Sequence, residues 1–321
     1  MSRMRNLIAA VALLLPLGAY AQTYPAKPVH LVVPYAPGGS TDLAARVLAA
    51  KLTDMWGQQV VVDNRPGGNG FIGMVAGAKA APDGYTLTLA TVGEAAISEA
   101  LFDNTPYNMA RDFVPVSMVA DADLVLVAAK ESPFNSVQDV LDGAKKQPGR
   151  LSVATPGAGT ISQILLEWMS LNSGTKFQHI PYKGGGPGAA AVAGNNVPLG
   201  ILSASGVTSY VKSGHVRVLA VFGTKRSSLD QSWPTLIESG VKDVTGSTWA
   251  ALFAPKGTPP AIVEKINKDV VTALKSDDLI ARYAGAGSLA VSSTPDELAA
   301  RMKRESDSYR SIIKAANIRS D

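Results

Sequence analysis

Two glycine-rich turns are the segments of this 321-residue chain whose residue types and spacing best suit ligand chemistry. The first turn, Pro37-Gly38-Gly39-Ser40-Thr41, follows a β-branched run at 29–33 and precedes an apolar pattern of helical spacing at 43–55. A turn of this kind leaves backbone N–H groups free at the positive end of a helix dipole. The sequence therefore predicts that this turn holds an anion.

A second turn, Thr155-Pro156-Gly157-Ala158-Gly159-Thr160, repeats the arrangement about 119 residues later. Each turn is followed by a helical pattern, a strand and a further glycine pair, in Arg65-Pro66-Gly67-Gly68 and in Tyr182-Lys183-Gly184-Gly185. The repeat predicts two similar α/β lobes, and open α/β sheets bind ligands at the carboxyl ends of their strands. We therefore expect a cleft with one anion-binding helix end on each side. The alternative is that both turns are ordinary connections.

Residues suited to catalysis or metal binding are scarce. The chain has no cysteine, and its histidines, at 30, 179 and 215, lack the spacing of a metal site. It contains neither a phosphate-binding loop nor a G-x-S-x-G nucleophile elbow, and the glycine run at 184–188 lacks the lysine of the former. The sequence therefore favours a binding protein over an enzyme, with no catalytic residue, cofactor or metal.

Residues 1–21 have the features of a signal peptide. Two arginines precede a short apolar run at 7–15, and Ala19-Tyr20-Ala21 fits the cleavage pattern. A proline and a glycine make the run too short for the alternative, a membrane anchor. The sequence predicts secretion. Without the two arginines of this segment the net charge falls from +4 to +2, which is too mild to indicate nucleic-acid binding.

Strand and helix patterns alternate along the rest of the chain, which predicts parallel βαβ units in open sheets. The expected strands span 29–33, 59–63, 86–90, 124–129, 151–154, 176–180, 199–202 and 216–222. Apolar residues recur at helical spacing near 43–55 and 161–168. Two more helices are expected in the last third, one capped by Thr258 before Pro259-Pro260 and one at the capping box Thr294-Pro295-Asp296-Glu297.

Several motifs occur in an order and spacing that are typical of one family. They are Tyr24-Pro25-x-Lys27-Pro28, Val33-Pro34-Tyr35-x-Pro37-Gly38-Gly39-x-x-Asp42, Val62-x-Asn64-Arg65-Pro66-Gly67-Gly68-x-Gly70-x-Ile72-Gly73, Pro82-Asp83-Gly84-Tyr85, Pro181-Tyr182-Lys183-Gly184, Arg217-x-Leu219-Ala220, Pro234-Thr235-x-x-Glu238-x-Gly240 and Ala254-Pro255-x-Gly257-Thr258-Pro259. In these motifs, over nearly the whole mature chain, the protein resembles the Bug family, the extracytoplasmic solute receptors of tripartite tricarboxylate transporters.

The resemblance implies an α/β protein with a type II periplasmic-binding-protein fold, in which two α/β lobes surround a ligand cleft. One lobe would comprise 22–124 plus 249–321, and the other 125–248, after a signal peptide at 1–21. The implied function is that of a periplasmic receptor, monomeric, that captures a small carboxylate and delivers it to the membrane permease of a tripartite tricarboxylate transporter. The implied ligands are di- and tricarboxylates, aromatic acids and acidic amino acids.

In the resembled family, the first βα loop of each lobe holds the ligand's carboxylates, largely through backbone N–H groups and waters. On this chain the expected ligand-binding residues are Tyr35, Pro37, Gly38, Gly39, Ser40, Thr41, Thr91, Thr155, Gly157, Gly159, Thr160, Tyr182, Lys183 and Ser203. We expect Asp42 to be a first-turn residue of the helix. For Arg65 we favour a structural role, as a partner of loop carbonyls, over the alternative of a cation that binds the ligand.

The chain departs from the family pattern at two places, and both leave the identity of the ligand open. Gln163 stands where many members carry a histidine, and Asn195-Asn196-Val197-Pro198 lacks an acid that many members have. Two other functions remain as alternatives: a periplasmic hydrolase or transferase that acts on a small acid, and the ligand-presenting subunit of a sensor.

Overall fold

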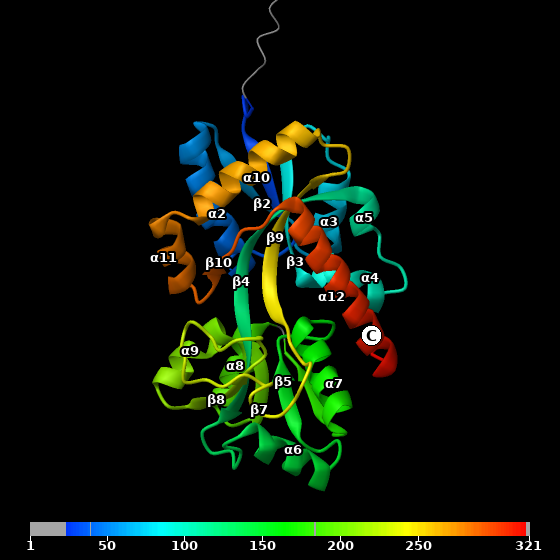
Figure 1. Ribbon diagram of the computed structural model, residues 1–321, viewed down its shortest axis with the longest axis vertical. Coiled ribbons are helices and arrows are strands. Elements are labelled where there is room, and N and C mark those ends of the chain that lie inside the picture. The colour runs from blue at the N-terminus through cyan, green and yellow to red at the C-terminus, as the bar shows by residue number, and fades with distance from the viewer. Residues whose placement is uncertain (1–23, 39, 183, 319–321) are drawn as a thin grey trace, which may run out of the picture.

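The computed structural model describes residues 24–38, 40–182 and 184–318 (Figure 1). The expected signal peptide, Gly39 and Lys183 lie outside the described residues. Figure 1 shows two lobes stacked along the long axis and joined by two long strands. Within the described part of the chain, the helices are too short or too polar to cross a bilayer.

A ten-stranded sheet runs through both lobes in the order β2-β1-β3-β9-β4-β7-β5-β6, and β8 and β10 pair with β4 beside this path. The strands are β1 (Val29–Val33), β2 (Val60–Asn64), β3 (Thr86–Thr91), β4 (Phe113–Ala129), β5 (Ser152–Thr155), β6 (Gln178–Pro181), β7 (Leu199–Ser203), β8 (Val216–Val221), β9 (Ser247–Pro255) and β10 (Leu289–Ala290).

The helices cover the faces of this sheet in both lobes. They are α2 (Ser40–Trp56), η1 (Gly68–Gly70), α3 (Phe71–Ala78), η2 (Gly93–Ile97), α4 (Ser98–Leu101), α5 (Met109–Asp112), α6 (Val137–Lys146), α7 (Ile161–Ser173), α8 (Gly185–Ala193), α9 (Ala204–Lys212), α10 (Pro260–Leu274), α11 (Asp277–Gly285) and α12 (Pro295–Ala315). The expected capping box at Thr294 and Glu297 is confirmed. The expected cap at Thr258 is wrong, because Pro259 holds that position and the Thr258 hydroxyl donates to the Pro255 carbonyl.

The internal repeat is confirmed by the pairing of the strands. In the upper lobe β1 pairs in parallel with β2 on one side and β3 on the other, and in the lower lobe β5 does the same with β6 and β7. Helix α2 follows β1, and α7 follows β5. Each lobe therefore presents the start of one helix at the carboxyl end of its central parallel strand.

The two long strands correct the expectation of purely parallel sheets. Strand β4 pairs antiparallel with β9 through residues 113–123 and with β7 and β8 through residues 124–129. Strand β9 was not expected, and β4 was expected only over its last third, at 124–129. Pro115 and two irregular registers interrupt the strand pattern of β4, and the alanines of β9 are poor strand formers. Long-range pairing outweighs both local signals.

Candidate ligand-binding site

A cavity of about 440 Å³ lies between the two lobes, where the starts of α2 and α7 face it. Ser40 and Thr41, the first residues of α2, line one side, and Ile161 and Ser162, the first residues of α7, line the other. Backbone N–H groups in a first helical turn have no acceptor within the helix. The cavity therefore has two sets of N–H donors at the positive ends of two helix dipoles.

The structure brings half of the expected ligand-binding residues to this cavity. Those that line it are Tyr35, Ser40, Thr41, Thr91, Gly159, Thr160 and Ser203. Pro37, Gly38, Thr155, Gly157 and Tyr182 do not line it. Gly39 and Lys183 lie outside the described residues.

Gly38 shapes the first loop without lining the cavity. Its backbone has φ +89°, a conformation that glycine adopts without steric cost. Its N–H donates to Asp42 Oδ2 at 2.8 Å, and so is not free for a ligand. Arg46 Nε donates to the same oxygen at 3.0 Å, and Asn64 Nδ2 donates to Asp42 Oδ1 at 2.9 Å and to the Tyr35 carbonyl at 3.1 Å.

Asp42 is therefore a first-turn residue that organises the loop, as expected, and it does not line the cavity. Burial acts to raise its pKa, but the hydrogen bonds from Arg46, Gly38 and Asn64 outweigh burial and hold that pKa below the usual value. Arg65 does not line the cavity either. Its Nε donates to Asp63 Oδ2 at 2.8 Å. Its described partner is thus a carboxylate rather than the expected loop carbonyl.

The second loop is organised by hydrogen bonds of its own. Gly159 has φ +74°, and its N–H donates to Gln163 Oε1 at 2.7 Å. The Thr160 hydroxyl donates to the Gly157 carbonyl at 2.7 Å. Thr155 Oγ1 lies 2.6 Å from Nε2 of His179, whose pKa burial lowers. Thr155, Gly157 and Gln163 thus shape the loop, and Gly159 and Thr160 present its surface to the cavity.

Ser162 is a site residue that the sequence analysis did not identify. Its side chain is buried and lines the cavity, and its Oγ has no hydrogen-bond partner among the described residues. A buried hydroxyl without a partner is costly, and native structures rarely keep one. A ligand acceptor at the start of α7 would satisfy it.

Glu94 is the second residue that the sequence analysis missed. It is 3% exposed, lines the cavity and contacts Tyr35 and Thr91, whose side chains also line it. Tyr35 Oη lies 2.5 Å from Glu94 Oε1, and Thr91 Oγ1 lies 2.7 Å from Glu94 Oε2. The spacing of Thr91 and Glu94 is that of a capping box, which was the available signal in the sequence.

No lysine, arginine or histidine is among the described residues that line the cavity, and Glu94 is their one ionisable acid. In the described part of the cavity, a negative charge on a ligand would therefore meet hydroxyls and backbone N–H groups rather than cationic side chains. Within the described ranges, no three histidine or acidic side chains gather as metal ligands would. The described part of the cavity is suited to hold an anion by hydrogen bonds and helix dipoles.

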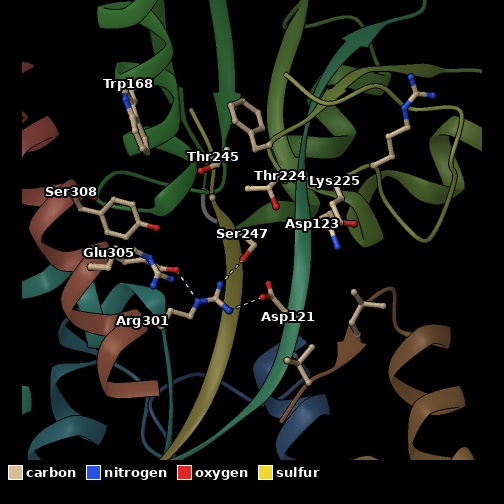
Figure 2. Close-up of a pocket in the computed structure, with 18 of the residues that line it drawn as sticks. Asp121, Asp123, Trp168, Thr224, Lys225, Thr245, Ser247, Arg301, Glu305 and Ser308 are labelled. Atoms are coloured by element: carbon tan, nitrogen blue, oxygen red, sulfur yellow. Dashed lines mark hydrogen bonds and ion pairs between the residues drawn. The ribbon is translucent and has the colours of Figure 1, made fainter. Parts of the chain in front are cut away.

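A larger cavity of about 640 Å³ lies on the opposite face of the two long strands (Figure 2). Asp121, Asp123 and Ser247 face it, whereas Leu124 and Thr248 face the first cavity, as the alternation of side chains along a strand requires. Figure 2 shows Arg301 of α12 reaching toward Asp121, Ser247 and Glu305.

The arginine of the larger cavity is already engaged. Its guanidinium donates to Asp121 Oδ2 at 2.9 Å, to Ser247 Oγ at 3.0 Å and to Glu305 Oε1 at 2.7 Å. Glu305 Oε2 accepts from Trp249 Nε1 at 2.7 Å. These bonds tie α12 to both long strands, so we assign this network to the junction of the lobes.

Comparisons with known proteins agree with this arrangement. Residues 44–318 match the family described as tripartite tricarboxylate transporter family receptor. Protein BugT of Bordetella pertussis is 38% identical over 295 residues, which cover 92% of this chain and 90% of BugT.

Two solved structures share the fold. Rpa4515 of R. palustris, solved with adipate, is 31% identical with a TM-score of 0.83, and the match covers 92% of this chain and 99% of that one. MatC (Rpa3494) from Rhodopseudomonas palustris, solved with bound malate, is 27% identical with a TM-score of 0.78, covering 90% of this chain and 100% of that one.

The expected type II periplasmic-binding-protein fold is confirmed by these likenesses. The alternative of a hydrolase or transferase is wrong, because the matching family consists of receptors. The chain belongs to the tripartite tricarboxylate transporter receptor family and is a solute receptor of the Bug type.

Proposed function

We propose that the protein captures a small dicarboxylate or related carboxylate in the 440 Å³ cavity and delivers it to the permease of a tripartite tricarboxylate transporter. The observation that carries the proposal is that the first turns of α2 and α7 face the cavity from opposite lobes, with no described cationic side chain between them. The relatives solved with adipate and with malate support a carboxylate as the ligand class.

The proposed site comprises the residues of both lobes that line the cavity with polar groups. In the upper lobe, Tyr35, Ser40, Thr41 and Thr91 would receive one end of the ligand, and in the lower lobe Thr160, Ser162 and Ser203 would receive the other. We divide the lobes at 22–124 plus 249–321 and 125–248, because β4 changes its pairing partners from β9 to β7 and β8 at Leu124.

Capture would proceed by closure of the lobes about β4 and β9. A ligand held from both sides contacts the second lobe only when the cavity is shut, so its differential contacts favour the closed state. The proposed location is the periplasm, reached through the expected signal peptide, and the receptor would act there as a monomer. A role in presenting the ligand to a sensor is the alternative destination.

Calorimetry with adipate and malate tests the proposal directly. We expect both acids to bind, and the uncharged analogue adipamide to bind at least about tenfold more weakly, because helix dipoles favour the anion. Equal affinity for adipate and adipamide would overturn the carboxylate proposal. Loss of uptake of labelled ligand in cells that lack this receptor, with uptake restored by the wild-type chain, would support delivery to a permease over presentation to a sensor.

A further inference from the structure

Three oxygen-bearing side chains close a ring at the edge of the ligand cavity. Tyr35 Oη lies 2.5 Å from Glu94 Oε1 and 2.9 Å from Thr91 Oγ1, and Thr91 Oγ1 lies 2.7 Å from Glu94 Oε2. The backbone N–H of Thr91 also donates to Glu94 Oε2 at 2.9 Å. All three side chains line the cavity, so the state of this ring decides what the cavity offers a ligand.

The number of protons in the ring depends on the charge of Glu94. Each of the three oxygen–oxygen contacts needs one hydrogen. If Glu94 is ionised, only the hydroxyls of Tyr35 and Thr91 supply hydrogens, and both must point at the carboxylate. If Glu94 is protonated, its O–H donates to Tyr35 Oη and the Thr91 hydroxyl donates to Glu94 Oε2. The Tyr35 hydroxyl then donates to Thr91 in the ligand-free protein, and it can turn to a ligand by giving up that one contact.

The surroundings of Glu94 favour the neutral form. The side chain is 3% exposed, and burial raises its pKa although the hydrogen bonds from Tyr35 and Thr91 act to lower it. Gly70 of η1 comes so close that a Cβ on it would lie 2.7 Å from Glu94 Oε1. Within the described ranges, no lysine, arginine or histidine hydrogen-bonds or pairs with Glu94.

Several ionisable groups on the elements packed against η2 have partners other than the Glu94 side chain. Glu99 of α4 accepts from Asn108 and from the backbone of Met109. On α12, Arg301 and Glu305 bond the long strands, and burial raises the pKa of Tyr309. The Tyr107 hydroxyl donates to the backbone carbonyl of Glu94, not to its side chain. Strand β3 brings no ionisable side chain.

We propose that Glu94 is held as a neutral carboxylic acid and acts as a positioning residue, which frees the Tyr35 hydroxyl to donate to a ligand carboxylate. An ionised Glu94 would engage that hydroxyl and also repel the ligand's charge, so both effects make binding depend on the same proton. This inference rests on the proposed function. It narrows the ligand class to carboxylates without an ammonium group, since a neutral Glu94 offers such a group no negative charge.

The competing role for a buried acid in such a cavity is recognition of an ammonium group, as in an acidic amino acid. The geometry argues against this role. Glu94 Oε2 already meets two donors of Thr91, and Glu94 Oε1 lies between Tyr35 and the backbone of Gly70. Neither oxygen is placed to receive a ligand ammonium without breaking the ring.

Calorimetry from about pH 5 to about pH 9 tests the proposal with malate and with aspartate, its amino analogue. For the wild type, we expect malate affinity to fall by up to about tenfold per pH unit once the free protein loses the Glu94 proton. Glu94→Gln places an N–H donor toward Tyr35 and an acceptor toward Thr91, so it should keep the affinity and lose the pH dependence. Glu131→Gln, an exposed substitution, should retain the wild-type profile.

Three results would overturn the proposal. The first is loss of malate binding in folded Glu94→Gln at every pH, since the negative charge would then be required. The second is tighter binding of aspartate than of malate that disappears in Glu94→Gln, which would assign the acid to an ammonium group. The third is a pH dependence that persists in Glu94→Gln and vanishes in His179→Gln, which would assign the proton to the histidine of the lower lobe.

Infrared difference spectroscopy of the ligand-free protein gives a second readout that needs no ligand. The spectrum of the wild type minus that of Glu94→Gln should contain the carbonyl stretch of a protonated carboxylic acid at neutral pH. A carboxylate band in its place would overturn the proposal. If the wild type binds neither adipate nor malate while this carbonyl band is present, the proposed ligand class fails and the assignment of the neutral acid stands.

Discussion

Gly287 of the upper lobe approaches Ser205 of the lower lobe so closely that a Cβ on Gly287 would lie 2.1 Å from Ser205 Cβ and 2.6 Å from its Cα. Gly287 has φ +71° and lies two residues past the end of α11, where its N–H and that of Ser288 bond carbonyls of the last helical turn. The same loop therefore closes a helix and forms a contact between the lobes.

Substitution of Gly287 by alanine should hinder closure of the cavity. The new Cβ meets Ser205 only when the lobes are together, so the closed state loses stability relative to the open state. We expect adipate affinity to fall by about tenfold, or about 1.4 kcal/mol. Separately, alanine at this positive φ should lower the free energy of unfolding by ~1–2 kcal/mol. Small-angle scattering should show less compaction at a fixed adipate concentration.

Gly285→Ala is the matched control, because Gly285 lies two residues earlier in the same turn, has a negative φ and has open space around its Cβ position. Its adipate affinity should equal that of the wild type. A Gly287→Ala protein that binds and compacts as the wild type does would show that this contact has no part in closure.

Ser162→Ala should separate binding from stability. The Ser162 hydroxyl is buried without a described partner, so its removal costs the ligand-free protein no hydrogen bond, and we expect the free energy of unfolding to stay within about 0.5 kcal/mol. Ligand affinity should fall by about 1–2 kcal/mol if the hydroxyl donates to the carboxylate. Thermal unfolding and calorimetry with adipate measure the two quantities.

Ser170→Ala provides the opposite pattern on the same helix. The Ser170 hydroxyl donates to the Leu166 carbonyl at 2.8 Å, away from the cavity, so its loss should affect stability slightly and affinity not at all. Equal affinities for the Ser162→Ala and wild-type proteins would place the ligand away from the start of α7.

The parts of the site that sequence alone predicted are those set by local turn chemistry. The turns at Gly38 and Gly159 need positive φ angles, and a polar residue, Ser40 or Thr160, stands where each turn meets its helix, so both loops could be located from residue types. Their detailed use could not be predicted. The Gly38 N–H, expected to face a ligand, is bound by Asp42, a contact that also needs Asn64 of the next strand.

The residues that sequence missed depend on tertiary contacts. Glu94 meets Tyr35 across 59 positions, because β1 and β3 are neighbours in the sheet and both end at the cavity. Strand β9 and the first part of β4 were missed for the same reason, because they are held by each other rather than by a strong strand pattern of their own. Neither relationship leaves a periodic signal in a single sequence.

Arg301→Ala should destabilise the junction of the lobes. Arg301, Asp121 and Glu305 are all at least three-quarters buried at their side chains, and the substitution leaves two acids without their cation. We expect the free energy of unfolding to fall by about 3 kcal/mol, as measured by denaturant titration. Arg304→Ala removes the same charge from an exposed position of the same helix and should change it by less than about 0.5 kcal/mol. Equal losses for the two variants would show that the network contributes no specific stability.

The ligand-free protein should lose stability as the pH rises through the folded-state pKa of Glu94. Burial raises the folded-state pKa of this acid above its unfolded value, so over the interval between the two values the folded state binds more protons than the unfolded state. Stability therefore falls with rising pH across that interval, by at most about 1.4 kcal/mol per pH unit for one proton. The contribution is complete below the unfolded pKa and is lost as the pH rises through the folded pKa.

Denaturant titrations at matched pH values measure the difference in the free energy of unfolding between wild type and Glu94→Gln. This difference should shrink as the pH rises, whereas Glu131→Gln, the reference, should follow the wild type. A wild-type stability that rises with pH relative to Glu94→Gln would mean that Glu94 is ionised when folded, and that the hydroxyl of Tyr35 is committed to it.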